Sequence, residues 1–237
     1  MRTSQTTSPS LLSPPASSSR FCDLCDELAG GRANAFWSLY DGAPADRTVL
    51  RTGTFSVLPS IGQLVEGYLL VVPRAHVRAL SQLDGDALAE LERLKATLSA
   101  RLLPLYGAPI FFEHGACTGE TPRCGTDHAH MHVVPFGRPV DFADTLREDF
   151  PGTQLSRLSD IRQVAEQWPV YLLYQAQGGP LWVFDAKQMP SQHLRKLVAA
   201  ECGNGDWDWH NYGREPRLIR TIESVRAVLG GMSHEVP

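Results

Sequence analysis

Three histidines alternate with apolar residues in the stretch HAHMHVV, residues 128–134. Side chains alternate between the two faces of an extended strand, so this spacing predicts a strand with its imidazoles on one face and its small or apolar side chains in a core. The chain has eight histidines in 237 residues, and three of them lie here. A solvated face that holds histidines by chance is therefore the weaker interpretation. Imidazole titrates near neutrality and is a good nucleophile, so the stretch predicts a site. Its histidines are His128, His130 and His132.

The first segment differs from the rest of the chain. Residues 1–20 are rich in Ser, Thr and Pro, and this composition predicts a disordered leader. The segment lacks the apolar run of a secretory signal, and no stretch elsewhere reaches the roughly 18 to 20 apolar residues of a membrane span. We therefore expect a cytoplasmic protein with no membrane partner. The formal charge of -4 gives no electrostatic footprint for DNA.

Five cysteines are present, and two of them form the Cys-x-x-Cys pair Cys22 and Cys25. An odd number of cysteines with one close pair favours a reducing compartment over a disulfide framework. The pair has the spacing of a metal knuckle, and a pair of free thiols is the equal alternative on spacing alone.

Hydrophobic periodicity and turn residues predict an α+β fold, with one long helix between groups of strands. The helix begins after Asp84, carries leucines from Leu88 to Leu102, and is expected to end at Pro104 and Gly107. The strands expected around it are residues 47–51, 54–58, 67–72 and 110–113, followed by the histidine strand.

Beyond Gly137 the pattern predicts a smaller α/β unit. Helices are expected at 142–149, 158–167, 192–200 and 217–229, and strands at 171–175 and 181–184. We therefore predict three parts, namely a leader at 1–20, a catalytic domain at 21–137, and a C-terminal extension at 138–237 that shapes the substrate pocket.

The HAHMHVV stretch resembles the motif that names the histidine triad superfamily. The strands that precede the long helix, and the segment Pro73-Arg74-Ala75-His76, also resemble that family, so that the likeness covers roughly residues 21–136. The resemblance implies a histidine-triad-like antiparallel meander sheet with one long central helix. It also makes a homodimer plausible.

The same resemblance implies an enzyme that hydrolyses or transfers nucleotidyl groups at the α-phosphorus of a small nucleotide or nucleotide conjugate. His130 would be the nucleophile, and His132 would donate to a phosphate oxygen or to the leaving group. The zinc-bearing branch implies a structural zinc ion held by Cys22, Cys25, His76 and His128, with Cys124 as a rival ligand.

Six further residues are candidates for substrate binding. Glu113 and His114 end the strand before the motif, where a structural hydrogen-bonding role is the alternative. Arg123 and Thr126 lie in a loop whose amide, hydroxyl and guanidinium donors could surround a phosphate. Gln192 and Arg195 stand at a helix start, which could hold an anion.

Two other functions compete with this one. A zinc-stapled module could bind a nucleotide without turning it over, and a cupin-type metalloenzyme would use His128 and His130 as ligands of a catalytic metal. The long leucine helix and the cysteine pair fit a cupin poorly. The third histidine argues against the hexose-phosphate uridylyltransferase branch, which the resemblance associates with glutamine at that position.

Overall fold

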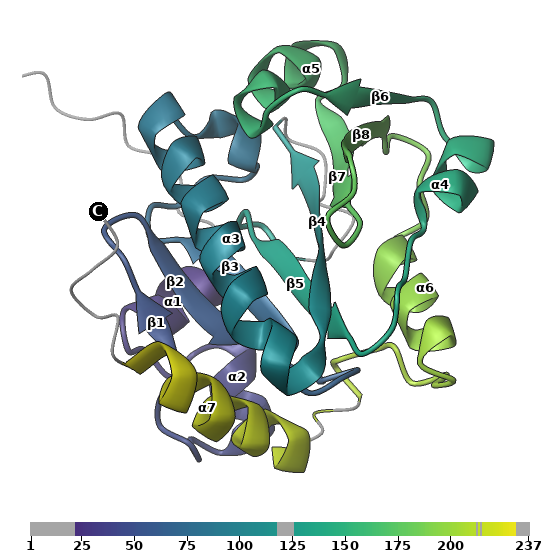
Figure 1. Ribbon diagram of the computed structural model, residues 1–237. Helices are drawn as coiled ribbons and strands as arrows, with labels where there is room; N and C mark the ends of the chain where they lie inside the picture. The colour runs from purple at the N-terminus through teal and green to yellow at the C-terminus, as the bar shows by residue number, and fades with distance from the viewer. Residues whose placement is uncertain (1–21, 118–125, 212, 214, 231–237) are drawn as a thin grey trace, which may run out of the picture.

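A single antiparallel sheet organises the chain. The computed structural model describes residues 22–117, 126–211, 213 and 215–230, so the predicted leader, Arg123 and Cys124 lie outside the described residues. The sheet has eight strands in the order β1-β2-β3-β5-β4-β7-β8-β6, and every neighbouring pair is antiparallel (Figure 1). The strands are β1 (Leu50–Arg51), β2 (Phe55–Pro59), β3 (Leu69–Pro73), β4 (Ala108–Ala116), β5 (Met131–Phe136), β6 (Gly152–Leu155), β7 (Val170–Gln175) and β8 (Leu181–Asp185).

Seven α-helices and two 3₁₀ turns accompany this sheet in the described part of the chain. The helices are α1 (Asp23–Leu28), α2 (Ala35–Tyr40), α3 (Gly85–Tyr106), α4 (Ala143–Asp149), α5 (Ile161–Gln167), α6 (His193–Glu201) and α7 (Glu215–Leu229), and the turns are η1 (Leu80–Gln82) and η2 (Leu158–Asp160). The predicted α+β fold with an antiparallel sheet and a long helix is confirmed. None of the described helices has the length and apolar character that a membrane span needs.

The sheet is buried on both faces because its strands alternate between two hydrophobic clusters. On β5, Met131 and Val133 pack in one cluster with the leucines of α3, which crosses in front of the sheet in Figure 1. Val134 belongs to the second cluster, where α4 and α6 cover the opposite face with Leu146 and Leu194. The period-two burial predicted for the apolar members of the motif is thus present. The histidines that alternate with them are left on the second face.

The long helix ends at Gly107, as predicted, although Pro104 does not interrupt it. Asp84 caps its N-terminus by accepting a hydrogen bond from the amide of Ala87 at 2.8 Å, and the helix continues past Pro104 to Tyr106. Pro104 is tolerated because it lies exposed in the last turn, where it removes a single amide donor. Gly107 ends the helix with φ at 95°, and a Cβ there would lie 2.0 Å from the carbonyl oxygen of Phe136. The glycine therefore permits the close approach of the helix end to β5.

Strands on both sides of the predicted boundary at residue 137 belong to the same sheet. β7 pairs with β4 from Phe111↔Gln175 to Ala116↔Val170, and β8 continues the sheet beyond it. The strand pairing is therefore continuous across residue 137. The division into a catalytic domain and a C-terminal extension stays a prediction. Sequence patterns missed α1 and α2, which are six residues each and too short to show a helical period, and β6, which is largely exposed.

The packing of α3 predicts unequal costs for two leucine truncations. Leu98 is fully buried against the sheet, whereas Leu103 is 58% exposed on the same helix. We expect Leu98→Ala to lower the free energy of unfolding by about 2–5 kcal/mol and Leu103→Ala by less than about 0.5 kcal/mol. Urea unfolding followed by circular dichroism measures both. Equal costs would contradict the assignment of α3 as the helix that covers this face.

Candidate functional site

The three histidines of the motif are all buried, with exposed fractions of 1%, 6% and 7% for His128, His130 and His132. β5 begins only at Met131, so His128 and His130 lie in the bent segment before the strand. The rings of His130 and His132 meet edge to face with centroids 4.7 Å apart, whereas the ring of His128 lies against that of His76. The bend thus separates His128 from the other two, a division that strict alternation along one strand does not predict.

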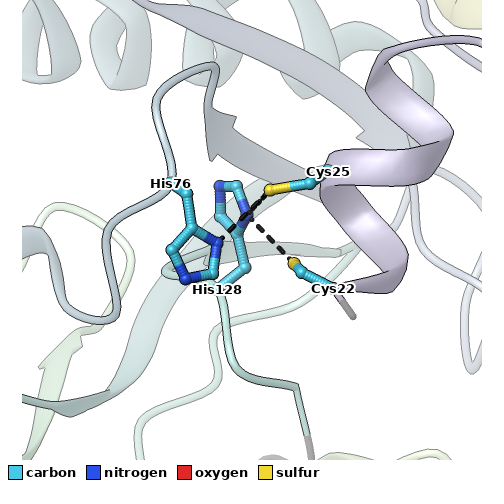
Figure 2. Close-up of side chains that lie close together, drawn as sticks. All are labelled: Cys22, Cys25, His76 and His128. Carbon is cyan, nitrogen blue, oxygen red and sulfur yellow. Dashed lines mark hydrogen bonds between the residues drawn. The ribbon is translucent and has the colours of Figure 1, made fainter. Parts of the chain in front are cut away.

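His128 joins a cluster with Cys22, Cys25 and His76, in which one ligand atom from each residue lies within 4.8 Å of the others. Figure 2 shows the two imidazoles facing the two thiols at the start of α1. The Nδ1 atom of His128 lies 3.5 Å from Cys22 Sγ and 3.4 Å from Cys25 Sγ, and His76 Nδ1 lies 3.3 Å from Cys25 Sγ. Nitrogen and sulfur ligands on a tetrahedral metal ion are about 3.6 Å apart. The four residues therefore have the spacing to hold a metal ion.

A backbone contact prepares His128 for this role. Its Nε2 lies 2.9 Å from the carbonyl oxygen of Pro73, and a carbonyl can only accept, so Nε2 carries the proton. Burial lowers the pKa of His128 to about 4, so the ring is neutral at pH 7. Its Nδ1 then presents a lone pair to the two thiols, which is the arrangement of a metal-binding imidazole with an oriented second nitrogen.

The same logic fixes the tautomer of His130. Its Nδ1 lies 2.7 Å from the carbonyl oxygen of His128 and must donate to it. Burial lowers the pKa of His130 below its ordinary value, with Arg47 acting in the same direction, while the carbonyl contact and Glu113 oppose the shift. A neutral ring with its proton on Nδ1 carries a lone pair on Nε2. His130 is thus a neutral imidazole whose Nε2 lone pair is not used by the backbone contact.

His132 is held by an aromatic neighbour on each side. Its Nδ1 lies 2.7 Å from the hydroxyl of Tyr68, and its ring stacks on Phe112 with centroids 4.3 Å apart. Burial lowers its pKa well below the usual range, and the neighbouring charges of His130, His114 and Arg195 lower it further. His132 is therefore a neutral ring of fixed orientation beside His130.

A pocket opens beside His130 and His132, and its empty space of about 560 Å³ includes volume that is open to solvent. Of the predicted substrate-binding residues, Thr126, Gln192 and Arg195 line it. Arg195 also donates to the carbonyl oxygen of Trp207 at 2.5 Å and to that of Gly62, so its buried guanidinium connects two loops beside the pocket.

The remaining predicted substrate residues lie elsewhere. Glu113 and His114 are buried behind the pocket rather than among its lining residues, and Arg123 lies outside the described residues. Glu113 accepts hydrogen bonds from the amide of Leu80 at 2.7 Å and from the hydroxyl of Tyr171 at 2.8 Å. It therefore ties η1 to β4 and β7, which is the structural alternative considered for it.

Sequence reasoning missed a second wall of the pocket. Helix α1 contributes Asp23, Leu24 and Glu27 to the lining. Glu27 accepts two hydrogen bonds from Arg47, at 2.6 and 2.8 Å, and this ion pair is nearly inaccessible to solvent. Arg47 also donates to the carbonyl oxygen of Pro59, which ties α1 to β2. A buried ion pair between distant segments leaves no local sequence signal, so tertiary structure was needed to find it.

Comparison with known proteins gives one family match. Residues 49–143 match the family described as "Protein similar to CwfJ C-terminal", which is a histidine-triad-like domain. This segment of the chain is therefore similar to a histidine-triad-like domain. No curated protein sequence matches the chain.

Solved structures similar to this chain include histidine triad proteins of low identity. A zinc-bound histidine triad family protein from Mycobacterium smegmatis is 17% identical, with 44% of this chain and 75% of that chain covered and a TM-score of 0.35. A member of the family from Bacillus subtilis is 16% identical, with 62% and 96% covered and a TM-score of 0.37. Yeast Ap4A phosphorylase Apa2 is 14% identical, with 84% and 80% covered and a TM-score of 0.43.

The buried environment of Glu113 on β4 predicts a pH dependence of stability. Burial raises the pKa of this carboxyl from 4.5 to about 7, against the opposing hydrogen bonds from Leu80 and Tyr171. Because the folded-state pKa is raised, the contribution of Glu113 to stability is complete below pH 4.5 and is lost as the pH rises through 7. Relative to Glu113→Gln, the free energy of unfolding of the wild type should fall by about 3 kcal/mol between pH 4.5 and pH 8.

Urea unfolding of both proteins across this range gives the comparison. Other pH-dependent groups are shared by the two proteins and cancel in the difference. If the difference in free energy of unfolding between the two proteins stays constant with pH, the raised pKa of Glu113 is contradicted.

Proposed function

We propose that this protein is a nucleotidyl hydrolase or nucleotidyltransferase that attacks the α-phosphorus of a nucleotide-containing substrate through His130. The main support for this proposal is the tautomer of His130, which has its proton on Nδ1. The Nδ1–H bond to the His128 carbonyl leaves the Nε2 lone pair available, and His130 is among the residues that line the pocket. The histidine-triad-like domain supports the choice of a nucleotide as the substrate.

In the first step, His130 Nε2 forms a bond to the α-phosphorus while the bond from phosphorus to the leaving group breaks. The leaving group departs with the electron pair of that bond and takes up a proton. In the second step, water or another acceptor attacks the phosphorus, loses its proton, and the P–N bond returns its electron pair to Nε2. Each cycle thus regenerates the neutral imidazole, and two easier steps replace one difficult step.

His132 supports the developing charge. When the Tyr68 hydroxyl donates to its Nδ1, His132 carries its proton on Nε2 and donates from there to a phosphoryl oxygen. Thr126 and Gln192 add polar groups to the same pocket, and Arg195 adds a positive charge to its rim. These groups act on an oxygen that gains negative charge in the transition state, where such donors are most effective.

The cluster of Cys22, Cys25, His76 and His128 fits zinc. Two sulfur and two nitrogen atoms at tetrahedral spacing are a usual structural zinc set, and all four positions are used by protein atoms. Zinc bound there would fasten α1 to the segment before β5, so its contribution is structural. It would hold the pocket wall and His130 in place without contacting the substrate.

The C-terminal residues 138–237 complete the pocket in this proposal. Gln192 just before α6, Arg195 within it and Trp209 from the following loop are among the residues that line the pocket. These residues would contact the leaving group or the acceptor. A homodimer and a cytoplasmic location stay predictions from the sequence.

Two alternatives predict other results. A nucleotide-binding module would bind the same ligands without turnover. A cupin-type enzyme would share one metal between His128 and His130, but His128 Nδ1 faces the two thiols while His130 Nδ1 is bonded to the backbone. The geometry therefore favours separate roles for these two histidines.

Replacing His130 should abolish the nucleotide-releasing activity and leave the protein folded. We expect His130→Ala to lower the release of nucleoside monophosphate by at least about 10³-fold, because it removes the nucleophile. Dinucleoside polyphosphates and nucleoside phosphoramidates serve as substrates, and mass spectrometry of the quenched wild-type reaction should find a nucleotide on His130. His210→Ala, which changes an exposed histidine, is the control and should keep full activity. Activity that survives in His130→Ala would exclude this nucleophile.

The metal cluster predicts a different pattern. Purified wild type should contain one zinc ion per chain, and Cys25→Ser and His128→Ala should each weaken zinc binding by at least about tenfold and lower the melting temperature. Cys202→Ser is the matched control, because Cys202 lies outside the cluster. Elemental analysis and a competition titration with a chelator measure the effect. Equal zinc contents in Cys25→Ser and Cys202→Ser would rule out the assigned ligands.

A further inference from the structure

One carboxylate in the pocket has no ion-pair partner. Asp23, the first residue of α1, lines the same pocket as His130. The other charged side chains of the lining are already engaged, because Glu27 pairs with Arg47, and Arg195 donates to backbone carbonyls. None of the ion pairs in the described part of the chain involves Asp23. This carboxylate therefore has acceptor sites to offer to a ligand.

The negative charge of Asp23 determines which part of a nucleotide lies beside it. A phosphate at His130 is an anion, and two negative charges in a partly buried pocket repel each other. An ionised carboxylate only accepts hydrogen bonds, so the group that meets it must donate them. The nucleoside part of a nucleotide is uncharged and carries such donors. With the phosphate at His130, Asp23 therefore faces the nucleoside.

Apolar side chains form the part of the pocket wall next to Asp23. Phe36 and Ile61 belong to one buried cluster, and Ala35 and Trp209 pack against it. All four of these residues line the pocket. Burial raises the pKa of Asp23, against an opposing hydrogen bond from the backbone of Ala35, so the carboxylate lies at the edge of this apolar wall. A wall with two aromatic side chains suits a flat base better than a sugar.

A glycine allows Trp209 to reach this wall. Gly62 has φ at 62°, and a Cβ there would lie 2.8 Å from the Cα of Trp209. Arg195 donates to the carbonyl oxygens of both Gly62 and Trp207, so it fastens the loop that carries Trp209 to the turn after β2. The C-terminal part of the chain thus brings an aromatic residue into the pocket through a close backbone contact.

The hydrogen-bonding edges of the common bases differ in how they fit a carboxylate. Guanine presents two adjacent donors, N1–H and the N2 amine, and the two oxygens of one carboxylate accept both. Adenine and cytosine carry a ring nitrogen with a lone pair beside their amine, and uracil carries its N–H between two carbonyls. Each of these three would turn an acceptor toward the carboxylate. We propose that the pocket binds a guanine base against Phe36 and Trp209, with Asp23 accepting hydrogen bonds from its N1 and N2 groups.

This inference rests on the proposed function for the choice of a nucleotide, and it adds the identity of the base. The guanosine lies on one side of the bond that breaks, either in the nucleotidyl group or in the leaving group. Both cases use the same contact with Asp23. Binding therefore tests the contact, and turnover of suitable substrates locates the guanosine.

The first experiment measures binding of GMP, IMP and AMP to the full chain by titration calorimetry. IMP keeps the N1–H donor and lacks the N2 amine. The wild type should bind GMP at least about tenfold more tightly than IMP or AMP. Asp23→Asn should bring the dissociation constants of GMP and IMP within about threefold of each other, because an amide offers one acceptor oxygen in place of two. Asp144→Asn is the control, since this carboxylate is 91% exposed on α4, and it should keep the wild-type preference.

Two results of the titrations would overturn the proposal. The first is a preference for GMP over IMP that is equal in the wild type and in Asp23→Asn. The second is a wild type that binds GMP, IMP and AMP equally well. The second comparison requires no variant, so it decides the question even if Asp23→Asn does not fold.

The aromatic wall is tested separately from the base edge. Trp209→Leu should weaken the binding of all three nucleotides by at least about fivefold and keep the preference for GMP, because stacking is tolerant of the base. Trp37→Leu is the matched control, because Trp37 lies on α2 beside Phe36 but outside the pocket lining. Melting temperatures of both variants check their folding. Equal losses of affinity in the two variants would refute the contact with Trp209.

The second experiment locates the guanosine during turnover. If it lies in the nucleotidyl group, the kcat/KM for guanosine 5′-phosphoramidate should exceed that for the inosine compound by at least about tenfold. If it lies in the leaving group, these two substrates should react equally, and a polyphosphate that joins adenosine to guanosine should leave only adenylate on His130. Asp23→Asn should remove either bias. Equal rates with the phosphoramidates, together with both nucleotides on His130, would overturn the proposal.

The base preference and the enzymatic function fail in different ways. A wild type that binds GMP through Asp23 but releases no nucleotide from any substrate would refute the enzymatic function and leave the guanine site standing. A wild type that turns over guanosine and inosine substrates equally through His130, with no base preference in binding, would refute the guanine site and leave the function standing.

Discussion

The hydrogen bond from His128 Nε2 to the Pro73 carbonyl is the interaction on which the rest of the site depends. It joins the end of β3 to the segment before β5, and it sets which nitrogen of His128 faces Cys22 and Cys25. The carbonyl of His128 then sets the tautomer of His130. Two backbone carbonyls therefore determine the protonation of two successive histidines. The nitrogen of His128 left without a proton lies beside the two thiols.

The burial of this site explains why neutral rings can persist at neutral pH. The sheet packs both faces against helices, so water has little access to the rings, and burial disfavours their charged forms. A buried imidazolium would need a nearby carboxylate, yet Glu113 is held by an amide and a phenol rather than by the histidines. The fold therefore favours the neutral form of His130 over a permanent positive charge.

Much of the fold could be predicted from local patterns because those patterns recur over several residues. Leucines recur with the helical period along α3, and histidines recur at every second residue in HAHMHVV. The second pattern is the one that drew attention to His130. The pairing of Arg47 with Glu27 could not be predicted, because it joins segments 20 residues apart without a repeated pattern. The bend that turns His128 away from His132 is set by tertiary contacts in the same way.

Helix α1 connects two sites that are chemically separate. Its six residues follow Cys22, include Cys25, and present Asp23, Leu24 and Glu27 to the pocket. A helix this short has little stability of its own, so its position is set by what holds it at each side. Under the proposed zinc binding, metal occupancy and pocket occupancy are linked through α1. A pocket ligand that favours the position of this helix then strengthens zinc binding by the same factor by which zinc strengthens the binding of that ligand.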